Sequence, residues 1–110
     1  MKPNRLEALF ALLEETPNDP FLFYGIALEY LKTDENKAIS YFEKLLTDFP
    51  DYVPTYYHAA QLYSELGRRP QAQQTYEKGL QVSSAQAEHH AYKELRSAYT
   101  NFMLEEDDEE

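Results

Sequence analysis

Matching side chains recur at a spacing of 33 to 34 residues, and this repetition is the feature that most constrains the fold. Large and small side chains follow the same order in both copies. The first copy is Phe23, Ile26, Ala27, Tyr30, Ala38, Phe42, Leu45 and Pro50, and the second is Tyr56, Ala59, Ala60, Tyr63, Ala72, Tyr76, Gly79 and Ser84. The spacing changes after Tyr30 because the turn there is one residue shorter in the first copy. A period of this length predicts an array of stacked units, each built from a few elements.

The apolar periodicity is helical throughout, and no stretch alternates in steps of two as a strand would. Asn4 and Glu7 have the spacing of a capping box, and Gly67 fits a left-handed C-terminal cap. Asp19 precedes Pro20 as an N-cap. The connectors are only a few residues long, so neighbouring helices should be antiparallel. We expect six helices, over about residues 4–16, 20–32, 34–48, 54–67, 70–83 and 84–104.

The order of large and small residues resembles that of the tetratricopeptide repeat family over about residues 20–84. The first copy departs from the family at "KTDEN", where a glycine turn is usual, and the second departs at Ser84, where proline is usual. The resemblance implies an all-α fold, a right-handed stack of antiparallel helix hairpins of the α-solenoid type. We expect a single domain over residues 1–104, with two full repeats at about 20–50 and 53–84 and single flanking helices at 4–16 and 84–104.

Small residues in the second copy indicate how two of these helices approach each other. We expect Ala60 to face Ala72 on the next helix, because small side chains allow close contact. Tyr63 and Tyr76 would fill the space on either side, as the packing density of protein interiors requires. A single hairpin of this kind cannot bury its apolar face alone, so neighbouring helices must stack on it.

The second helix has two apolar stripes, although a surface helix needs only one. Its core stripe is Phe23, Ile26, Ala27 and Tyr30, and its second stripe is Phe21, Tyr24, Leu28 and Leu31. In the family that the chain resembles, the first helix of each repeat lines a concave groove, which implies that the second stripe faces such a groove. The predicted partner-binding residues are Phe21, Tyr24, Leu28, Lys32, Tyr57, His58 and Gln61. The other interpretation is that the first and last helices cover these residues and make them part of the core.

One binding mode of the resembled family clamps a C-terminal carboxylate with lysine and asparagine side chains in the groove. Tyr24, Leu28 and His58 occupy those places in this sequence. Lys32 is the only lysine at the groove edge in the first repeat, and a single point charge does not make a clamp. The sequence therefore does not predict the binding of chaperone tails.

The net charge of the chain is −10, and the last six residues, 105–110, are all acidic. The other 104 residues carry a net charge of only −4 and contain no Lys/Arg patch. Nucleic acid and an anionic membrane surface are therefore both disfavoured as partners. Like charges repel, so we expect residues 105–110 to form a disordered tail. This tail either keeps the chain soluble, docks on a basic partner, or covers Arg68 and Arg69.

No constellation of residues in the sequence indicates catalysis, a metal or a cofactor. His90 and Glu94 share a helix face, but His89 points elsewhere and no third ligand is evident. The three glycines are isolated, which argues against a phosphate-binding loop. No serine lies at a spacing that suggests a nucleophile and its base. We therefore expect a protein that is not an enzyme and that uses no metal or cofactor.

The sequence has no cysteine and no apolar run of about 20 residues, and its first 19 residues do not read as a signal peptide. These features predict a cytoplasmic protein without a membrane span. The expected function is that of a protein–protein interaction adaptor or scaffold, which binds a peptide or helix in a concave, tyrosine-rich groove. The alternative is a structural module that self-assembles into homo-oligomers through exposed end helices.

Overall fold

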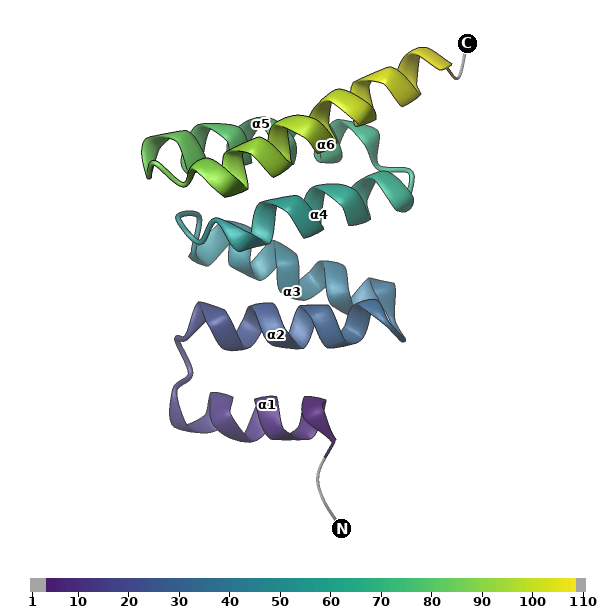
Figure 1. Ribbon diagram of the computed structural model, residues 1–110. Coiled ribbons are helices and arrows are strands. Elements are labelled where there is room, and N and C mark those ends of the chain that lie inside the picture. Colours follow the sequence, from purple (N-terminus) through teal and green to yellow (C-terminus); the bar gives the residue numbers. More distant parts are fainter. Residues whose placement is uncertain (1–3, 109–110) are drawn as a thin grey trace. The chain divides into compact units, whose positions relative to one another are not determined.

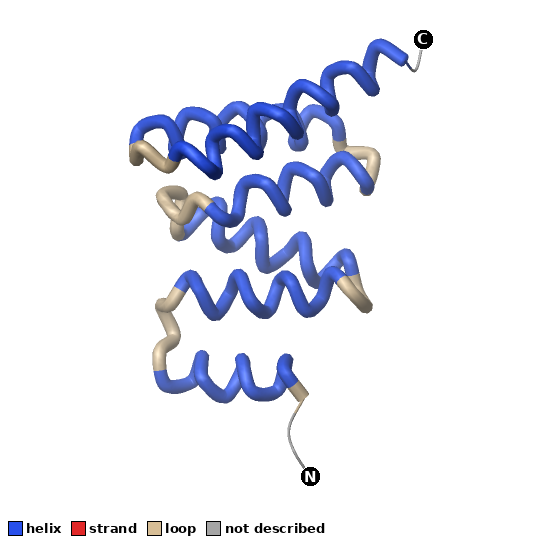
Figure 2. The backbone as a smooth tube through the Cα atoms, viewed as in Figure 1, coloured by secondary structure: helices blue, strands red, loops and turns tan. Residues whose placement is uncertain are grey.

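The computed structural model describes residues 4–108, and every regular element in that range is a helix (Figures 1 and 2). The helices are α1 (Arg5–Glu15), α2 (Pro20–Leu31), α3 (Glu35–Asp48), α4 (Pro54–Glu65), α5 (Arg69–Ala85) and α6 (His89–Asp108). They pack as sequential hairpins, in which α2 pairs with α3 and α4 pairs with α5. The predicted all-α fold with six helices is therefore confirmed.

Side-chain caps start three of the helices, two of them at the predicted capping residues Asn4 and Asp19. The cap oxygens accept backbone N–H groups as follows: Asn4 Oδ1 from Glu7 at 2.7 Å, Asp19 Oδ1 from Phe21 at 2.9 Å, and Asp34 Oδ1 from Lys37 at 3.1 Å. Each bond satisfies a donor that has no partner within its own helix. Pro20 and Pro54 are the first residues of α2 and α4, where a missing N–H costs nothing.

The C-terminal end of α4 is a Schellman motif. Gly67 has a φ of 78°, which is the left-handed conformation that glycine adopts without strain. The N–H of Arg68 donates to the carbonyl oxygen of Tyr63 at 2.8 Å, and the N–H of Gly67 donates to that of Ser64 at 3.1 Å. The predicted glycine cap is therefore confirmed.

The junction between α5 and α6 differs from the prediction. The sequence predicts that the sixth helix begins at about residue 84, but α5 continues to Ala85 and α6 begins at His89. Serine is a common helix-starting residue, which is why this position reads as a boundary. Ser83 lies inside α5 instead, and its hydroxyl donates to the Leu80 carbonyl oxygen at 3.3 Å.

The far end of α6 also differs from the prediction. The helix continues to Asp108, so residues 105–108 are helical where the sequence predicts a disordered tail. Glutamate is a good helix former, which allows the helix to continue into an acidic segment. The rest of the predicted tail, residues 109 and 110, lies outside the described residues.

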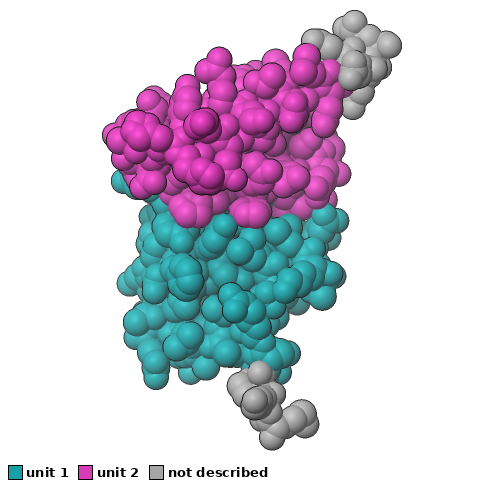
Figure 3. All heavy atoms as spheres, in the orientation of Figure 1, with its two compact units in different colours: residues 1–52 teal, residues 53–110 magenta. Residues whose placement is uncertain are grey.

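The helices form two compact units, residues 1–52 and 53–110, which are coloured separately in Figure 3 and are called unit 1 and unit 2 below. In unit 1, α2 packs against both α1 and α3. Leu9 of α1 is buried together with Leu22 and Ile26 of α2. The Tyr41 ring of α3 has its centroid 5.8 to 6.4 Å from those of Phe10, Phe23 and Tyr30. Phe10, Tyr30 and Tyr41 therefore pack around an aliphatic cluster.

In unit 2, α5 packs against α4 and α6, and α6 also contacts α4. Ala60 and Ala72, the pair predicted at the helix crossing, are both fully buried. Gly79 allows a still closer approach, because a Cβ atom there would lie 2.6 Å from Tyr56 Cβ and 3.2 Å from Leu95 Cδ1. Gly79 therefore allows α4, α5 and α6 to meet at one point.

Candidate partner-binding groove

The predicted binding residues of unit 1 lie along α2 and form a partly accessible apolar strip. The Phe21 side chain is 59% exposed, whereas Tyr24 and Leu28 are half-buried. The Tyr24 ring meets the Tyr52 ring edge-on, with 5.8 Å between the centroids. A partner could therefore gain contact area at Phe21 without unfolding the helix.

Lys32, predicted at the edge of the groove, lies in a small charge cluster. Its Nζ is 2.9 Å from Glu29 Oε2, and the same oxygen is 3.5 Å from Arg5 Nε of α1. Both cationic side chains are well exposed, so these ion pairs contribute little to stability. The pairing nevertheless directs the charge of Lys32 toward Glu29.

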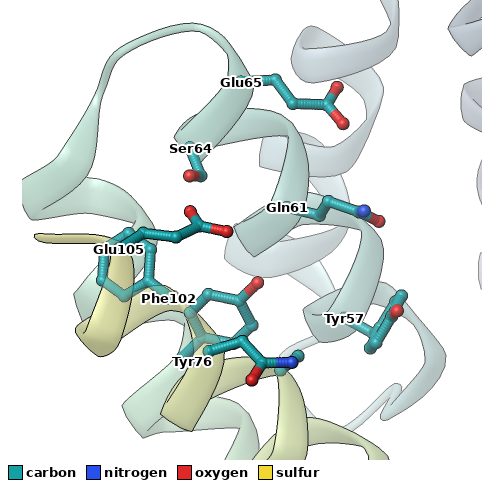
Figure 4. A pocket seen from close by; sticks show the side chains of 9 residues that line it. Tyr57, Gln61, Ser64, Glu65, Tyr76, Phe102 and Glu105 are labelled. Carbon is teal, nitrogen blue, oxygen red and sulfur yellow. The ribbon is translucent and has the colours of Figure 1, made fainter. Parts of the chain in front are cut away.

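In unit 2, a pocket of about 260 Å³ opens between α4 and α6 (Figure 4). Two of the predicted binding residues, Tyr57 and Gln61, line it from α4. Tyr76 of α5 extends its hydroxyl group into the pocket, as Figure 4 shows. The other lining residues are Ser64 and Glu65 of α4, and Ala98, Asn101, Phe102 and Glu105 of α6.

A second pocket, of about 430 Å³, adjoins the first, because Tyr57, Ala98 and Asn101 line both. Its other lining residues are His90, Lys93, Glu94 and Ser97 of α6. We call the two pockets together the α4–α6 groove. One end of this groove is acidic, with Glu65 and Glu105, and the other end carries charges of both signs.

The hydroxyl group of Tyr76 remains protonated in this groove at neutral pH. Burial is the main cause that raises the pKa of Tyr76 to about 12, and Tyr57, Glu105 and Glu65 raise it further. A protonated phenol can donate a hydrogen bond to a ligand oxygen. The influence of the two glutamates on Tyr76 also indicates that their carboxylates lie close to the pocket.

His58, the remaining predicted residue in unit 2, lies on α4 beside Tyr57, with 5.5 Å between the ring centroids. Burial lowers the pKa of His58 below its ordinary value of 6.5, and Glu94 of α6 partly opposes this change. The neutral imidazole is therefore favoured at pH 7. His58 is not among the residues that line either pocket, although Glu94 lines the second one.

The contribution of α6 to this groove was not evident in the sequence. The stripe of α6 that reads as core includes Leu95 and Phe102, and both are buried. The face that lines the groove is a second, polar stripe on the same helix, made of His90, Glu94, Ser97, Asn101 and Glu105. Polar residues at helical spacing are typical of a solvated surface. The polar stripe of α6 can therefore be recognised as one wall of a groove only when the structure places α4 beside it.

His90 of α6 forms an exposed pair with Glu94. His90 Nε2 lies 3.3 Å from Glu94 Oε1, and both side chains are mostly exposed. Within residues 4–108, no group of three or more His, Cys, Asp and Glu side chains could hold a metal ion. No helix in the same range is both long and apolar enough to cross a membrane.

Comparison with known proteins identifies relatives of this chain. The family profile described as "Tetratricopeptide repeat" matches residues 30–99. A crystal structure of a tetratricopeptide repeat domain protein from Salinibacter ruber is 38% identical, covers 78% of this chain and 97% of its own, and has a TM-score of 0.75. A solution NMR structure of such a protein from the same organism is 39% identical, covers 78% and 88%, and has a TM-score of 0.74.

A more distant likeness supports the fold alone. The solution structure of a protein from Bordetella parapertussis is 20% identical, covers 94% of this chain and 91% of its own, and has a TM-score of 0.79. The comparison with curated proteins found no match. The profile match covers more than half of the chain and includes most of both sequence copies. The chain therefore belongs to the tetratricopeptide repeat family, whose domains generally act as non-catalytic protein-interaction modules.

Proposed function

We propose that this chain is an adaptor or scaffold that binds a peptide or a partner helix in the α4–α6 groove. The observation that carries the proposal is the groove itself, in which Tyr57 lines both pockets and is only half-buried. Tyrosine contributes strongly at protein interfaces because its ring supplies contact area at a low cost in conformational entropy. A partner that covers Tyr57 would therefore gain most of its contact area at the centre of the groove.

The polar side chains of the groove suit the backbone of a bound segment. Gln61 of α4 and Asn101 of α6 each offer both a donor and an acceptor, and the hydroxyl of Tyr76 offers a further donor. An extended peptide has unpaired N–H and C=O groups that need such partners. Aromatic contact area together with amide groups is a common arrangement for recognising peptides or helices.

The apolar strip of α2 supports a second contact surface, in unit 1. Phe21 is one of the few large apolar side chains that are well exposed among the described residues. Tyr24 and Leu28 continue the strip along the helix. We propose these three residues as a binding surface of unit 1 by itself, and Tyr57, His58 and Gln61 as predicted binding residues of unit 2. The pairing of Lys32 with Glu29 gives Lys32 the smallest role.

Affinity capture from a lysate of the source organism tests the proposed groove. We expect Tyr57→Ala to weaken capture of a specific partner by about 2 kcal/mol or more, because a central aromatic anchor is lost. Tyr92→Ala is the matched control, since Tyr92 also lies on α6 but is not among the residues that line the two pockets of the groove. Circular dichroism should show that both variants are folded.

Two other results would contradict this assignment. A partner that is held equally by the wild type and by Tyr57→Ala would place the interface outside the α4–α6 groove. Recovery of only further copies of the same chain would favour the self-assembling alternative.

A further inference from the structure

Two glutamates from different helices line the same end of the α4–α6 groove. Glu65 is the last residue of α4, and Glu105 lies on α6; both line the smaller pocket and both are exposed. In Figure 4, Glu105 extends toward Ser64 of α4, whereas the Glu65 side chain extends away from Glu105. No ion pair of either glutamate is found among the described residues. Both carboxylates are therefore available to a cationic ligand.

The position of Glu65 does not serve the stability of its own helix. The C-terminal end of a helix carries a partial negative charge, which favours cations and disfavours acids. The last turn of α4 contains no basic residue, so Glu65 and the helix dipole add to the same negative potential. In the sequence, Glu105 begins a run of six acidic residues, which extends this potential. Glu65 in this position does not stabilise its own helix, but its negative charge can attract a cationic ligand.

Aromatic rings line the same pocket as the carboxylates. Tyr57, Tyr76 and Phe102 all line it, and ring faces attract ammonium and guanidinium groups. The molecule already contains one such contact, because the guanidinium of Arg69 lies 4.2 Å from the centroid of Phe102. Arg69 also donates from Nη2 to the Phe102 carbonyl oxygen at 2.9 Å, so this cation is fixed to the backbone of α6. No ion pair between Arg69 and Glu65 or Glu105 is found among the described residues.

We propose that the acidic end of the α4–α6 groove binds a lysine or arginine side chain, and that the partner is therefore a segment with a basic residue at a fixed position. This inference rests on the proposed function. The basic group would lie between Glu65 and Glu105, while its aliphatic stem would lie against Tyr57, which is half-buried. The rest of the segment would continue toward the end of the groove with mixed charges. Recognition of this kind differs from carboxylate capture, since the signs of the charges on protein and ligand are reversed.

Selection from a library of random 12-residue peptides displayed on phage tests this inference. The wild type should enrich peptides that share a lysine or arginine at one aligned position. Replacing that residue by glutamine in a selected synthetic peptide should weaken binding about tenfold in a fluorescence titration, as expected for a charge-assisted contact. The same replacement should have little effect on binding to the double variant Glu65→Gln/Glu105→Gln.

A matched control removes the same number of negative charges from a different place. Glu14→Gln/Glu15→Gln changes two exposed acids of α1 and should retain the wild-type preference. Equal enrichment of basic peptides by Glu65→Gln/Glu105→Gln would overturn the inference, because attraction would then come from the net charge. Enrichment of peptides with no basic preference that still require Tyr57 would overturn it too, while leaving the proposed function intact. No enrichment from the library would count against both.

Discussion

At the scale of single residues, Gly79 determines how closely three helices can approach. A Cβ atom at this position would lie 2.6 Å from Tyr56 Cβ, an atom attached directly to the backbone of α4. Gly25 has a similar role in unit 1, but its nearest neighbour is Leu9 Cδ2 at 3.2 Å, the flexible end of a side chain. The two glycines should therefore respond differently to the same substitution.

We predict that Gly79→Ala lowers the free energy of unfolding by about 1 kcal/mol or more. Alanine would normally stabilise a helix interior by about 1 kcal/mol relative to glycine. Here the added methyl group cannot be accommodated without moving α4, and overpacking of this kind typically costs about 1–3 kcal/mol. Urea denaturation measures the difference, with Gly25→Ala as the milder control. A Gly79→Ala variant as stable as the wild type would show that the helices separate easily.

The lowered pKa of His58 predicts how the free energy of unfolding depends on pH. Its pKa in the folded chain is lowered, mainly by burial, so the unfolded chain binds a proton more readily. The contribution of His58 is therefore constant at high pH and is lost as the pH falls through 6.5, the ordinary pKa of the imidazole. The loss ends below the lowered pKa of the folded state.

Comparison of wild type with His58→Gln isolates this contribution from that of the many carboxylates. The free energy of unfolding should be measured for both proteins between about pH 5 and 8. We expect the wild type to lose more stability than the variant as the pH falls through this range. Parallel pH profiles would mean that the imidazole is as well hydrated in the folded chain as in the unfolded one.

At the scale of the elements, the C-terminal ends of α4 and α5 both form a Schellman motif, but with different residues in the left-handed position. α5 ends like α4, since Glu88 N–H donates to the Ser83 carbonyl oxygen at 2.9 Å and Ala87 N–H donates to that of Ser84 at 3.1 Å. The left-handed position is occupied by Ala87, with a φ of 56°, where α4 has Gly67. An L-residue in this conformation is strained by about 1–2 kcal/mol.

Ala87→Gly should therefore stabilise the chain by about 0.5–1 kcal/mol. The relief of strain exceeds the extra flexibility that glycine gives to the unfolded chain. Gly67→Ala is the reciprocal experiment and should destabilise the chain by about 1 kcal/mol, although nothing lies within 4 Å of the new methyl group. Thermal denaturation measures both changes. The two substitutions should change the melting temperature in opposite directions. An Ala87→Gly variant that melts below the wild type would refute the strain argument.

At the scale of the whole molecule, the family and the helix order were predictable because their signals are local or periodic. Caps such as Asn4 and Asp19 act on neighbouring N–H groups, so they are readable without knowledge of the fold. The boundary between α5 and α6 was not readable, because Ala87 in a left-handed conformation has no signature in the sequence. The α6 side of the groove was missed for another reason. A polar stripe on a helix cannot be recognised as a groove wall until the structure places α4 opposite it.

The pairing of helices with close neighbours along the chain also bears on how the protein folds. The helices that pack together are consecutive or, for α4 and α6, separated by one helix. Contacts between segments close in sequence cost little loop-closure entropy and are associated with fast folding. Unit 1 has its own apolar core within residues 1–52, so it can begin to fold while the ribosome is still adding residues 53–110. Each new helix can therefore cover the apolar face of the preceding helix in the order in which the ribosome makes them.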